Sequence, residues 1–347
     1  MSMKPIQFGS DNYAGAHPAV MAAVADANTH HVPGYGGDLV TARLEQVMRE
    51  RFGADTEVFP VFNGTGANVV SLQSMLPRWG GAIVTETAHV NTDENAAPER
   101  IGGIKLLTQP TDDGRLNPGC IPAALTGVEV PHNTEPMVVS FSNSTELGTV
   151  HSLEQIRDIT TTAHEHGLLV HCDGARLANA AAALGVELAE ATEGVDVISL
   201  GGTKLGALGA ELIVVRNSDA THGINQLRKI DLQLASKQRF LSAQLLALYE
   251  GDLWHELATT ANTMAARLTA ALEQLPGVSI PSKPEANAVV AVLPAGVADR
   301  VRELGWLFYD WPAAGIPGAV RLMTAWDTTT EAVDELVADI AANLDHG

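Results

Sequence analysis

Short apolar runs recur along the first 240 residues of the chain, each followed by a turn and usually by a helical pattern. The runs are continuous rather than alternating and are rich in valine and isoleucine, which indicates strands buried on both faces. They occupy residues 57–62, 82–86, 103–108, 137–142, 168–172, 195–200 and 211–215. Strands that alternate with helices in this way predict an α/β fold with a parallel sheet covered by helices.

Helical periodicity between the runs is clearest in two segments, residues 152–166 and 175–184. In the first segment, Ser152 is the candidate N-cap, because its hydroxyl can accept a hydrogen bond from the first turn. Gly167 is the candidate stop, because glycine adopts the left-handed conformation that ends many helices.

The first fifty residues have a different texture, with glycines and prolines around two predicted helices, residues 18–29 and 39–52. We expect residues 1–50 to form an N-terminal arm that lies against either domain of the chain or against a partner chain. The strand-rich part that follows, residues 51–240, is predicted to be the large domain.

After about residue 240 the pattern changes again. A stretch rich in alanine and leucine, residues 241–275, predicts one or two long helices, and residues 330–344 predict a final amphipathic helix. Between them lie three short strand candidates, residues 288–293, 306–311 and 319–325. Because turns rather than long helices separate most of these strands, we expect residues 241–347 to form a smaller α+β domain.

The composition, 46% hydrophobic and 18% charged over 347 residues, is that of a globular protein. The net charge of −20 would repel phosphate backbones and anionic lipids, which argues against nucleic-acid and membrane partners. No apolar stretch reaches the roughly 18 residues of a membrane helix, and the first residues do not resemble a signal peptide. Cys120 and Cys172 make neither a disulfide framework nor a metal cluster. We therefore expect a cytoplasmic protein without a metal site.

Ligands of open α/β sheets bind at the carboxyl ends of the strands, so the turns there are the candidate sites. The first of three such turns contains Asn63, Gly64, Thr65 and Gly66 and leads into a predicted helix. Small residues at a helix start expose backbone N–H groups to an anion, and the Thr65 hydroxyl can add a donor. Taken alone, a tight turn with Asn63 or Thr65 as N-cap is the better interpretation.

The second turn places Asp173 at a strand end and Arg176 on the first turn of the next helix. A carboxylate there can face a cationic ring nitrogen, and an arginine fork can bind a substrate carboxylate. The alternative is an N-cap aspartate beside a solvated arginine, because such caps are common.

The third turn holds one lysine, Lys204, among glycines and apolar residues between two buried strands. Desolvation would lower its pKa and make the neutral amine available for a Schiff base. The alternative is a lysine whose amine reaches solvent from a mobile loop. Together, the three turns supply what a pyridoxal phosphate site needs: an anion-binding helix start, an acid for the ring nitrogen and a buried lysine.

At this point the sequence resembles the low-specificity L-threonine aldolases, a family of pyridoxal phosphate enzymes of fold type I. The resemblance covers nearly the whole chain. Its landmarks are Gly9-Ser10-Asp11, Tyr35-Gly36-Gly37-Asp38, Asn63-Gly64-Thr65-Gly66-Ala67-Asn68, Ala88-His89, Thr145-Glu146-Leu147-Gly148-Thr149-Val150, His171-Cys172-Asp173-Gly174-Ala175-Arg176, Thr203-Lys204 and Val320-Arg321-Leu322-Met323-Thr324. The resemblance implies a mostly parallel seven-stranded sheet, a smaller C-terminal domain and a homotetramer built as a dimer of dimers.

The resemblance also implies how the cofactor, pyridoxal 5'-phosphate, is held. Lys204 would form a Schiff base with it, and Asp173 would pair with the pyridine nitrogen. His89 would stack on the ring, although the same residue could be a plain loop histidine. Gly64 and Thr65 would hold the phosphate. By the same resemblance Arg176 would share its contacts between cofactor and substrate.

For the substrate, the resemblance assigns the carboxylate to Ser10, Arg176 and Arg321. Arg321 stands out without it, because an arginine in an apolar strand needs an anionic partner. His132 would be a second histidine near the substrate hydroxyl, although its neighbours are typical of a surface loop. Lys229 and Arg239 would reach the phosphate of a neighbouring subunit.

The sequence departs from the common family pattern in two places that the resemblance puts near the cofactor and the substrate side chain. Residues 12–15 replace a stretch that contains threonine and arginine in many relatives. Residues 142–146, Ser-Asn-Ser-Thr-Glu, replace a common Glu-Asn-Thr-His run.

The implied activity is retro-aldol cleavage of L-threonine or L-allo-threonine to glycine and an aldehyde, with His89, His132 or an ordered water as the base. On the same site, a phenylserine-type aldolase or a β-eliminating lyase is an alternative. A non-catalytic pyridoxal phosphate protein is a third interpretation, disfavoured because a carrier needs no clamp for a carboxylate. A nicotinamide dehydrogenase is poorer still, because no Gly-x-Gly-x-x-Gly opens a helix at the required place.

Overall fold

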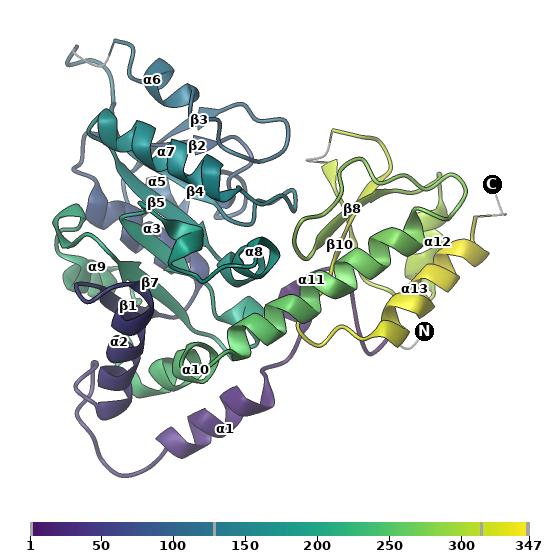
Figure 1. The fold of residues 1–347 in the computed structure, drawn as a ribbon, viewed down its shortest axis with the longest axis horizontal. Coiled ribbons are helices and arrows are strands. Elements are labelled where there is room, and N and C mark those ends of the chain that lie inside the picture. The colour runs from purple at the N-terminus through teal and green to yellow at the C-terminus, as the bar shows by residue number, and fades with distance from the viewer. Residues whose placement is uncertain (1–2, 128–129, 313–314, 345–347) are drawn as a thin grey trace.

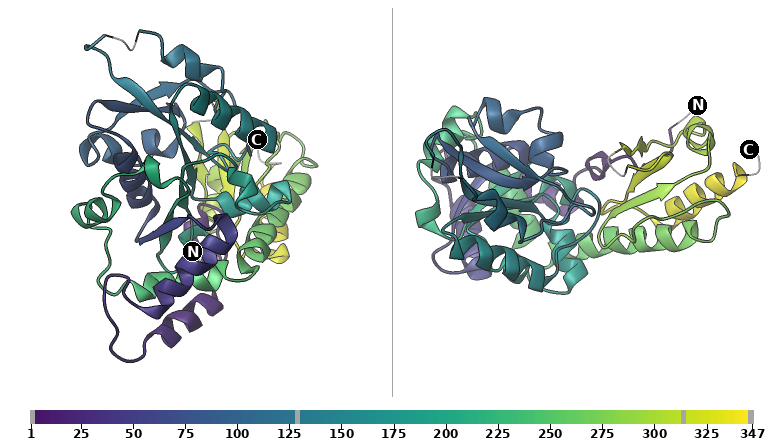
Figure 2. Two further views of the ribbon diagram at one scale, coloured as in Figure 1. Left: turned by 60° about the vertical axis from the view of Figure 1, so that its left-hand side comes forward. Right: turned by 90° about the horizontal axis from the view of Figure 1, so that it is seen from above.

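The computed structural model describes residues 3–127, 130–312 and 315–344. These residues form a seven-stranded sheet and a three-stranded sheet in two parts of the molecule that lie side by side (Figures 1 and 2). The long helix α11 (Leu253–Leu272) runs from one part into the other (Figure 1).

The seven-stranded sheet has the order β1-β7-β6-β5-β4-β2-β3. Its strands are β1 (Glu57–Val61), β2 (Gly80–Thr85), β3 (Lys105–Gln109), β4 (Glu135–Ser142), β5 (Leu169–Gly174), β6 (Val197–Leu200) and β7 (Glu211–Val215). The pairs from β6 to β3 are parallel, whereas β7 pairs antiparallel with both β1 and β6. The mostly parallel seven-stranded sheet is therefore confirmed, and each predicted strand coincides with an observed one.

Helices connect and cover these strands (Figure 1). They are α1 (Pro18–Ala27), α2 (Leu39–Phe52), α3 (Gly64–Met75), α4 (His89–Thr92), α5 (Ala97–Arg100), α6 (Cys120–Ala124), α7 (Leu153–Glu165), α8 (Leu177–Leu184), α9 (Ile224–Ile230) and α10 (Arg239–Tyr249). The start of α7 is as predicted, because the Ser152 hydroxyl accepts from the Gln155 N–H at 3.2 Å. Among the described residues, no helix has both the length and the apolar character needed to cross a membrane.

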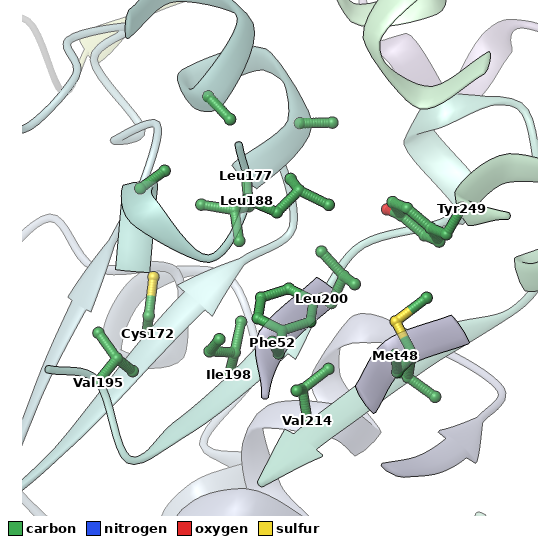
Figure 3. Close-up of a cluster of buried hydrophobic side chains, with 14 of the residues drawn as sticks. Met48, Phe52, Cys172, Leu177, Leu188, Val195, Ile198, Leu200, Val214 and Tyr249 are labelled. Atoms are coloured by element: carbon green, nitrogen blue, oxygen red, sulfur yellow. The ribbon is translucent and has the colours of Figure 1, made fainter. Parts of the chain in front are cut away.

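Alternate side chains of the sheet fill two separate apolar clusters, one on each face, which is why the strands are continuously apolar. On one face, Cys172, Ile198 and Val214 pack with Phe52 of α2 and Leu177 of α8 (Figure 3). On the other face, α3 and α9 supply the covering side chains. The helix that begins the candidate anion site is therefore anchored directly on the sheet.

The smaller sheet has the order β8-β10-β9, all antiparallel. It contains β8 (Ala288–Val292), β9 (Tyr309–Asp310) and β10 (Ala319–Met323), and packs with α11, α12 (Val297–Glu303) and α13 (Thr330–Ala342). The strand predicted at residues 306–311 is wrong for its first three residues. Trp306 and Phe308 are buried in this cluster, but they pair with no strand.

The packing also corrects the domain boundaries predicted at residues 50/51 and 240/241. All of α10 and the first half of α11, to Ala258, pack in the core of the large sheet, whereas α11 from Ala265 packs against the small sheet. The predicted N-terminal arm is divided in the same way, with Phe8 in the small core and Val20 in the large one. The change in composition near residue 240 marks the start of α10 and α11. It does not show which of the two cores these helices pack in.

Candidate active site

A cavity opens where the carboxyl ends of β4 and β5 and the turn after β6 meet the first residues of α3 and α4. Its lining is Gly64, Thr65, Asn68, His89, Glu94, Ser142, Ser144, Glu146, Asp173, Ala175, Arg176 and Lys204. The fold thus brings together six of the nine residues that the sequence assigned to the cofactor or substrate within one subunit. Ser10, Arg321 and His132 do not line the cavity.

Lys204 lies in a short 3₁₀ turn (Thr203–Leu205) directly after β6. The turn is held by Glu211 of β7, whose carboxylate accepts the N–H groups of Gly202 at 2.7 Å and Thr203 at 3.3 Å. Burial lowers the pKa of Lys204, and the positive charge of Arg176 acts in the same direction. The site therefore favours the neutral, nucleophilic amine more than water does.

Asp173 ends β5 with its side chain buried against the cavity. One carboxylate oxygen accepts from the Asn68 amide at 2.9 Å, and the other accepts from the Ala175 N–H at 3.1 Å. Burial alone would raise the pKa of Asp173, but the charges of His89 and Lys204 and the Ala175 hydrogen bond outweigh it and lower that pKa. The group is therefore a stable anion, able to hold a proton on a facing ring nitrogen.

His89 begins α4, and its Nδ1 lies 2.9 Å from Oε1 of Glu94, whose side chain has no exposed surface. This hydrogen bond raises the pKa of His89 against the opposing effect of burial. The same Glu94 oxygen accepts from Asn68 at 2.9 Å, so Asn68 joins Glu94 to Asp173. Sequence reasoning missed Glu94 and Asn68, since each lies inside a segment that reads as ordinary helix or loop.

The start of α3 is built as an anion site. Asn63 caps it by accepting the Gly66 N–H at 2.7 Å, and among the described residues no partner accepts the N–H groups of Gly64 or Thr65. Gln233 crosses over this turn and accepts the Phe62 N–H at 3.0 Å. A Cβ at Gly66 would lie 2.2 Å from the Gln233 carboxamide, so a larger residue there would displace the Gln233 side chain from the turn. Gln233 is a third residue whose role the sequence pattern did not reveal.

Arg176 is not a free carboxylate clamp. Its Nε and Nη2 donate to the two oxygens of Asp11 at 2.6 and 2.9 Å, and Asp11 is only 2% exposed. Burial opposes ionisation of Asp11, but Arg176 outweighs it and lowers the pKa to about 2. Ser10, next to Asp11, accepts the Asn12 N–H at 3.2 Å and so caps the short turn at Asp11–Tyr13.

Arg321 projects from β10 beside this pair, and no carboxylate of the described residues forms an ion pair with it. Its Nη2 donates to the Gly9 carbonyl at 3.4 Å, its guanidinium lies 4.1 Å from the Trp311 ring centroid, and its buried Nε has no described partner. Burial, and then the charge of Arg176, lower the pKa of Arg321. Asp11 is paired with Arg176 alone, so Arg321 has no carboxylate partner among the described residues, which leaves room for an anionic ligand.

The structure does not bring His132 to the cavity of its own subunit. His132 is exposed in the loop before β4, whereas the cavity lies at the other end of that strand, at Ser142. An eight-residue strand spans roughly 25 Å. The resemblance places His132 near the substrate hydroxyl, but the direction of the strand carries it away from this cavity.

These residues fit pyridoxal 5'-phosphate. The start of α3 suits its phosphate, Asp173 its ring nitrogen and Lys204 its aldehyde carbon. Three buried oxygens that belong to cavity-lining residues, Asn68 Oδ1, Glu94 Oε2 and Glu146 Oε2, have no partner among the described residues. Such atoms indicate a polar ligand, because an unpaired buried polar group is costly.

Fold and site together define a pyridoxal-phosphate-dependent lyase of fold type I, and the model of the β-eliminating lyase family matches residues 7–295. The low-specificity L-threonine aldolase of Pseudomonas aeruginosa is 40% identical over 337 residues, 96% of each chain. That of another Pseudomonas is 40% identical over 97% of each chain. The structure of Leishmania major threonine aldolase superimposes with a TM-score of 0.92 at 28% identity, over 98% of this chain and all of that one. The chain belongs to the low-specificity L-threonine aldolase family.

Proposed function

We propose that this chain cleaves L-threonine and L-allo-threonine-type β-hydroxy-α-amino acids to glycine and an aldehyde, with pyridoxal 5'-phosphate on Lys204. The observation that carries the proposal is the meeting of Lys204 and Asp173 in one cavity, beside the Asp11–Arg176 ion pair and an Arg321 that has no ion-pair partner among the described residues. An arginine beside the cavity that has no ion-pair partner in the described part of the chain suits the binding of a substrate carboxylate. A protein that only carried the cofactor would have no need of such a residue.

In this proposal the chain fixes the cofactor at three places. Lys204 binds it covalently, the N–H groups of Gly64 and Thr65 bind its phosphate, and Asp173 keeps its ring nitrogen protonated, with His89 stacked on the ring. When bound, the cofactor supplies the electron sink for the pair released as the Cα–Cβ bond breaks.

Arg321, with the remaining donors of Arg176, binds the substrate carboxylate and so fixes the direction of the Cα–Cβ bond. Asp11 holds Arg176 in one orientation by a two-point hydrogen bond, so the clamp is formed before the substrate arrives. Ser10 stays a proposed carboxylate contact from the adjacent turn.

The test is aldehyde release from L-threonine and from L-allo-threonine by the cofactor-loaded protein, followed with an aldehyde-reducing coupling enzyme. We expect acetaldehyde and glycine in equal amounts and no ammonia. Release of ammonia instead would favour the β-eliminating lyase, and cleavage of phenylserine alone would favour the aryl-specific aldolase. No spectral change with any amino acid would leave the non-catalytic carrier.

We further propose a cytoplasmic homotetramer, a dimer of dimers in which Lys229 and Arg239 reach the phosphate of a neighbouring subunit. Neither residue lines the cavity of its own chain: Lys229 lies over the Tyr35 ring at 5.5 Å, and Arg239 donates to the His30 carbonyl at 3.3 Å. Leu232 nearby is 82% exposed. Light scattering should give about four times 36.5 kDa. A monomer that is fully active would contradict this arrangement.

A further inference from the structure

Glu146 follows β4 and lines the cavity with Lys204, in the segment where the sequence departs from the common family pattern. Its Oε1 accepts two hydrogen bonds, from the Ser142 hydroxyl at 2.8 Å and from the His89 backbone N–H at 2.9 Å. Its Oε2 is buried and has no partner among the described residues. One oxygen therefore fixes the carboxyl group, and the other keeps its lone pairs for a ligand.

The other carboxylate and imidazole groups of the cavity are poorer proton acceptors. His89 is hydrogen-bonded to Glu94, which raises its pKa and favours the cation, in which both ring nitrogens already carry protons. Asp173 accepts from Asn68 and the Ala175 N–H, and its pKa is lowered, so it is a weak base. Glu94 also has a buried oxygen without a described partner, Oε2, but its Oε1 holds the His89 ring and the Asn68 amide, so this carboxylate is paired with the histidine cation.

The surroundings of Glu146 make it a better base than an exposed carboxylate. Burial raises its pKa, and the negative charge of Asp173 raises it further, against the hydrogen bonds from Ser142 and His89. Arg176, which interacts electrostatically with Glu146, is the cation on the side of the carboxylate clamp. Because Arg176 binds the substrate carboxylate in the function proposed above, Glu146 lies on the substrate's side of the cavity. A proton acceptor with a raised pKa in that place suits general base catalysis.

We infer that Glu146 is the base that accepts the β-hydroxyl proton of the substrate, an inference that rests on the function proposed above. The O–H bond breaks and its proton passes to Oε2, while the hydroxyl carbon becomes the aldehyde carbonyl. The Cα–Cβ bond breaks, and its electron pair stays on the glycine fragment. A proton then adds to that carbon, so the overall reaction neither consumes nor releases a proton.

Glu146→Gln tests the inference, because the amide keeps the size of the side chain and an acceptor oxygen but removes the basic carboxylate. We expect aldehyde release from L-threonine to fall by roughly 10²–10⁴-fold, the usual contribution of a positioned base. Exchange of the glycine α-proton in D₂O, followed by NMR, should continue at the wild-type rate. Glycine has no hydroxyl group, so this exchange needs Lys204 and the cofactor but not a hydroxyl base.

The pH profile is a second readout. Glu146 must be ionised to accept the proton, so kcat of the wild type should fall as the pH falls through its raised pKa. That acidic limb should move when Glu146 is shortened in Glu146→Asp and disappear from the residual activity of Glu146→Gln. The charged groups that face Glu146, Asp173, Arg176 and His89, are unchanged in both variants.

Glu165→Gln, on the exposed surface of α7, is the matched control and should leave cleavage, exchange and pH profile as in the wild type. Unchanged cleavage by Glu146→Gln would overturn the inference. So would an equal loss of cleavage and glycine exchange, because Glu146 would then act through the cofactor. If Glu146→Gln does not fold, Glu146→Asp decides, since an unshifted acidic limb in that variant overturns the inference. Failure of the proposed function can be told apart from failure of this inference, because the wild type itself would then release no aldehyde.

Discussion

Lys204→Ala is expected to abolish aldehyde release from every β-hydroxy-α-amino acid that the wild type cleaves. The loss should be at least about 10²–10⁴-fold, because one residue supplies both the covalent attachment of the cofactor and a nearby amine for proton transfer. The pKa of Lys204 is lowered by burial first and then by Arg176, which favours the neutral amine that attacks a carbonyl carbon. The measurement is aldehyde release together with the absorbance of the protein-bound cofactor.

Borohydride reduction followed by peptide mass spectrometry gives an independent readout. The wild type should carry one cofactor mass on the peptide that contains Lys204, and the variant should carry none. Lys283→Ala, at an exposed lysine of a loop in the smaller part, is the matched control and should behave as the wild type. Cofactor trapped on another lysine, or cleavage retained by Lys204→Ala, would show that the site has been assigned to the wrong residue.

Asp11→Asn is expected to lower the free energy of unfolding by about 3–5 kcal/mol, the usual result of removing one member of a buried ion pair. Asp11 is 2% exposed and accepts from Arg176 at 2.6 and 2.9 Å and from Asn287 at 3.1 Å. The substitution removes the anion that pairs with Arg176. The charge of Arg176 then stays buried, near Lys204 and Arg321, without a carboxylate partner. Urea unfolding of the wild type and the variant measures the difference, and KM for L-threonine should rise in parallel.

The pH dependence of the free energy of unfolding shows whether the Asp11–Arg176 ion pair stabilises the folded protein. The pKa of Asp11 falls to about 2 in the folded protein from an ordinary value of 3.8, so its ionised form favours folding. The contribution, about 2 kcal/mol, is therefore complete above pH 3.8 and is lost as the pH falls toward 2. Asp11→Asn should lack this part of the acid dependence.

A matched ion pair on the surface controls for geometry. Arg267 also donates through two nitrogens to one aspartate, Asp334, at 2.9 and 2.7 Å, but both side chains are about half exposed. Asp334→Asn should leave the urea unfolding curve close to that of the wild type, since solvent screens exposed pairs. The double variant Asp11→Asn/Arg176→Gln should lose less than the sum of the two single variants. Strict additivity would contradict the pairing.

The sequence was most informative where the signal is local. Ser152 was identified as an N-cap because a hydroxyl before a helical pattern has one obvious use, and its hydrogen bond to Gln155 is present. The apolar strands were identified because burial on both faces leaves no polar alternation. The strand predicted at residues 306–311 was wrong in its first three residues for the converse reason, since Trp306 and Phe308 are apolar because they are buried in the small core rather than because they pair in a strand.

The sequence by itself determined the α/β fold and the family. It also singled out Asp173, Arg176 and Lys204, because each of these residues follows a predicted strand whose pattern can be recognised. Only the tertiary structure decided which side chains meet. It joined Asp11 to Arg176 across 165 residues, brought Glu146 into the lining of the cavity and placed His132 at the end of β4 far from the cavity. Such contacts depend on strand direction and on how the small sheet packs against the large one. A local pattern of residues contains neither, because both are set by the burial of surfaces far apart in the chain.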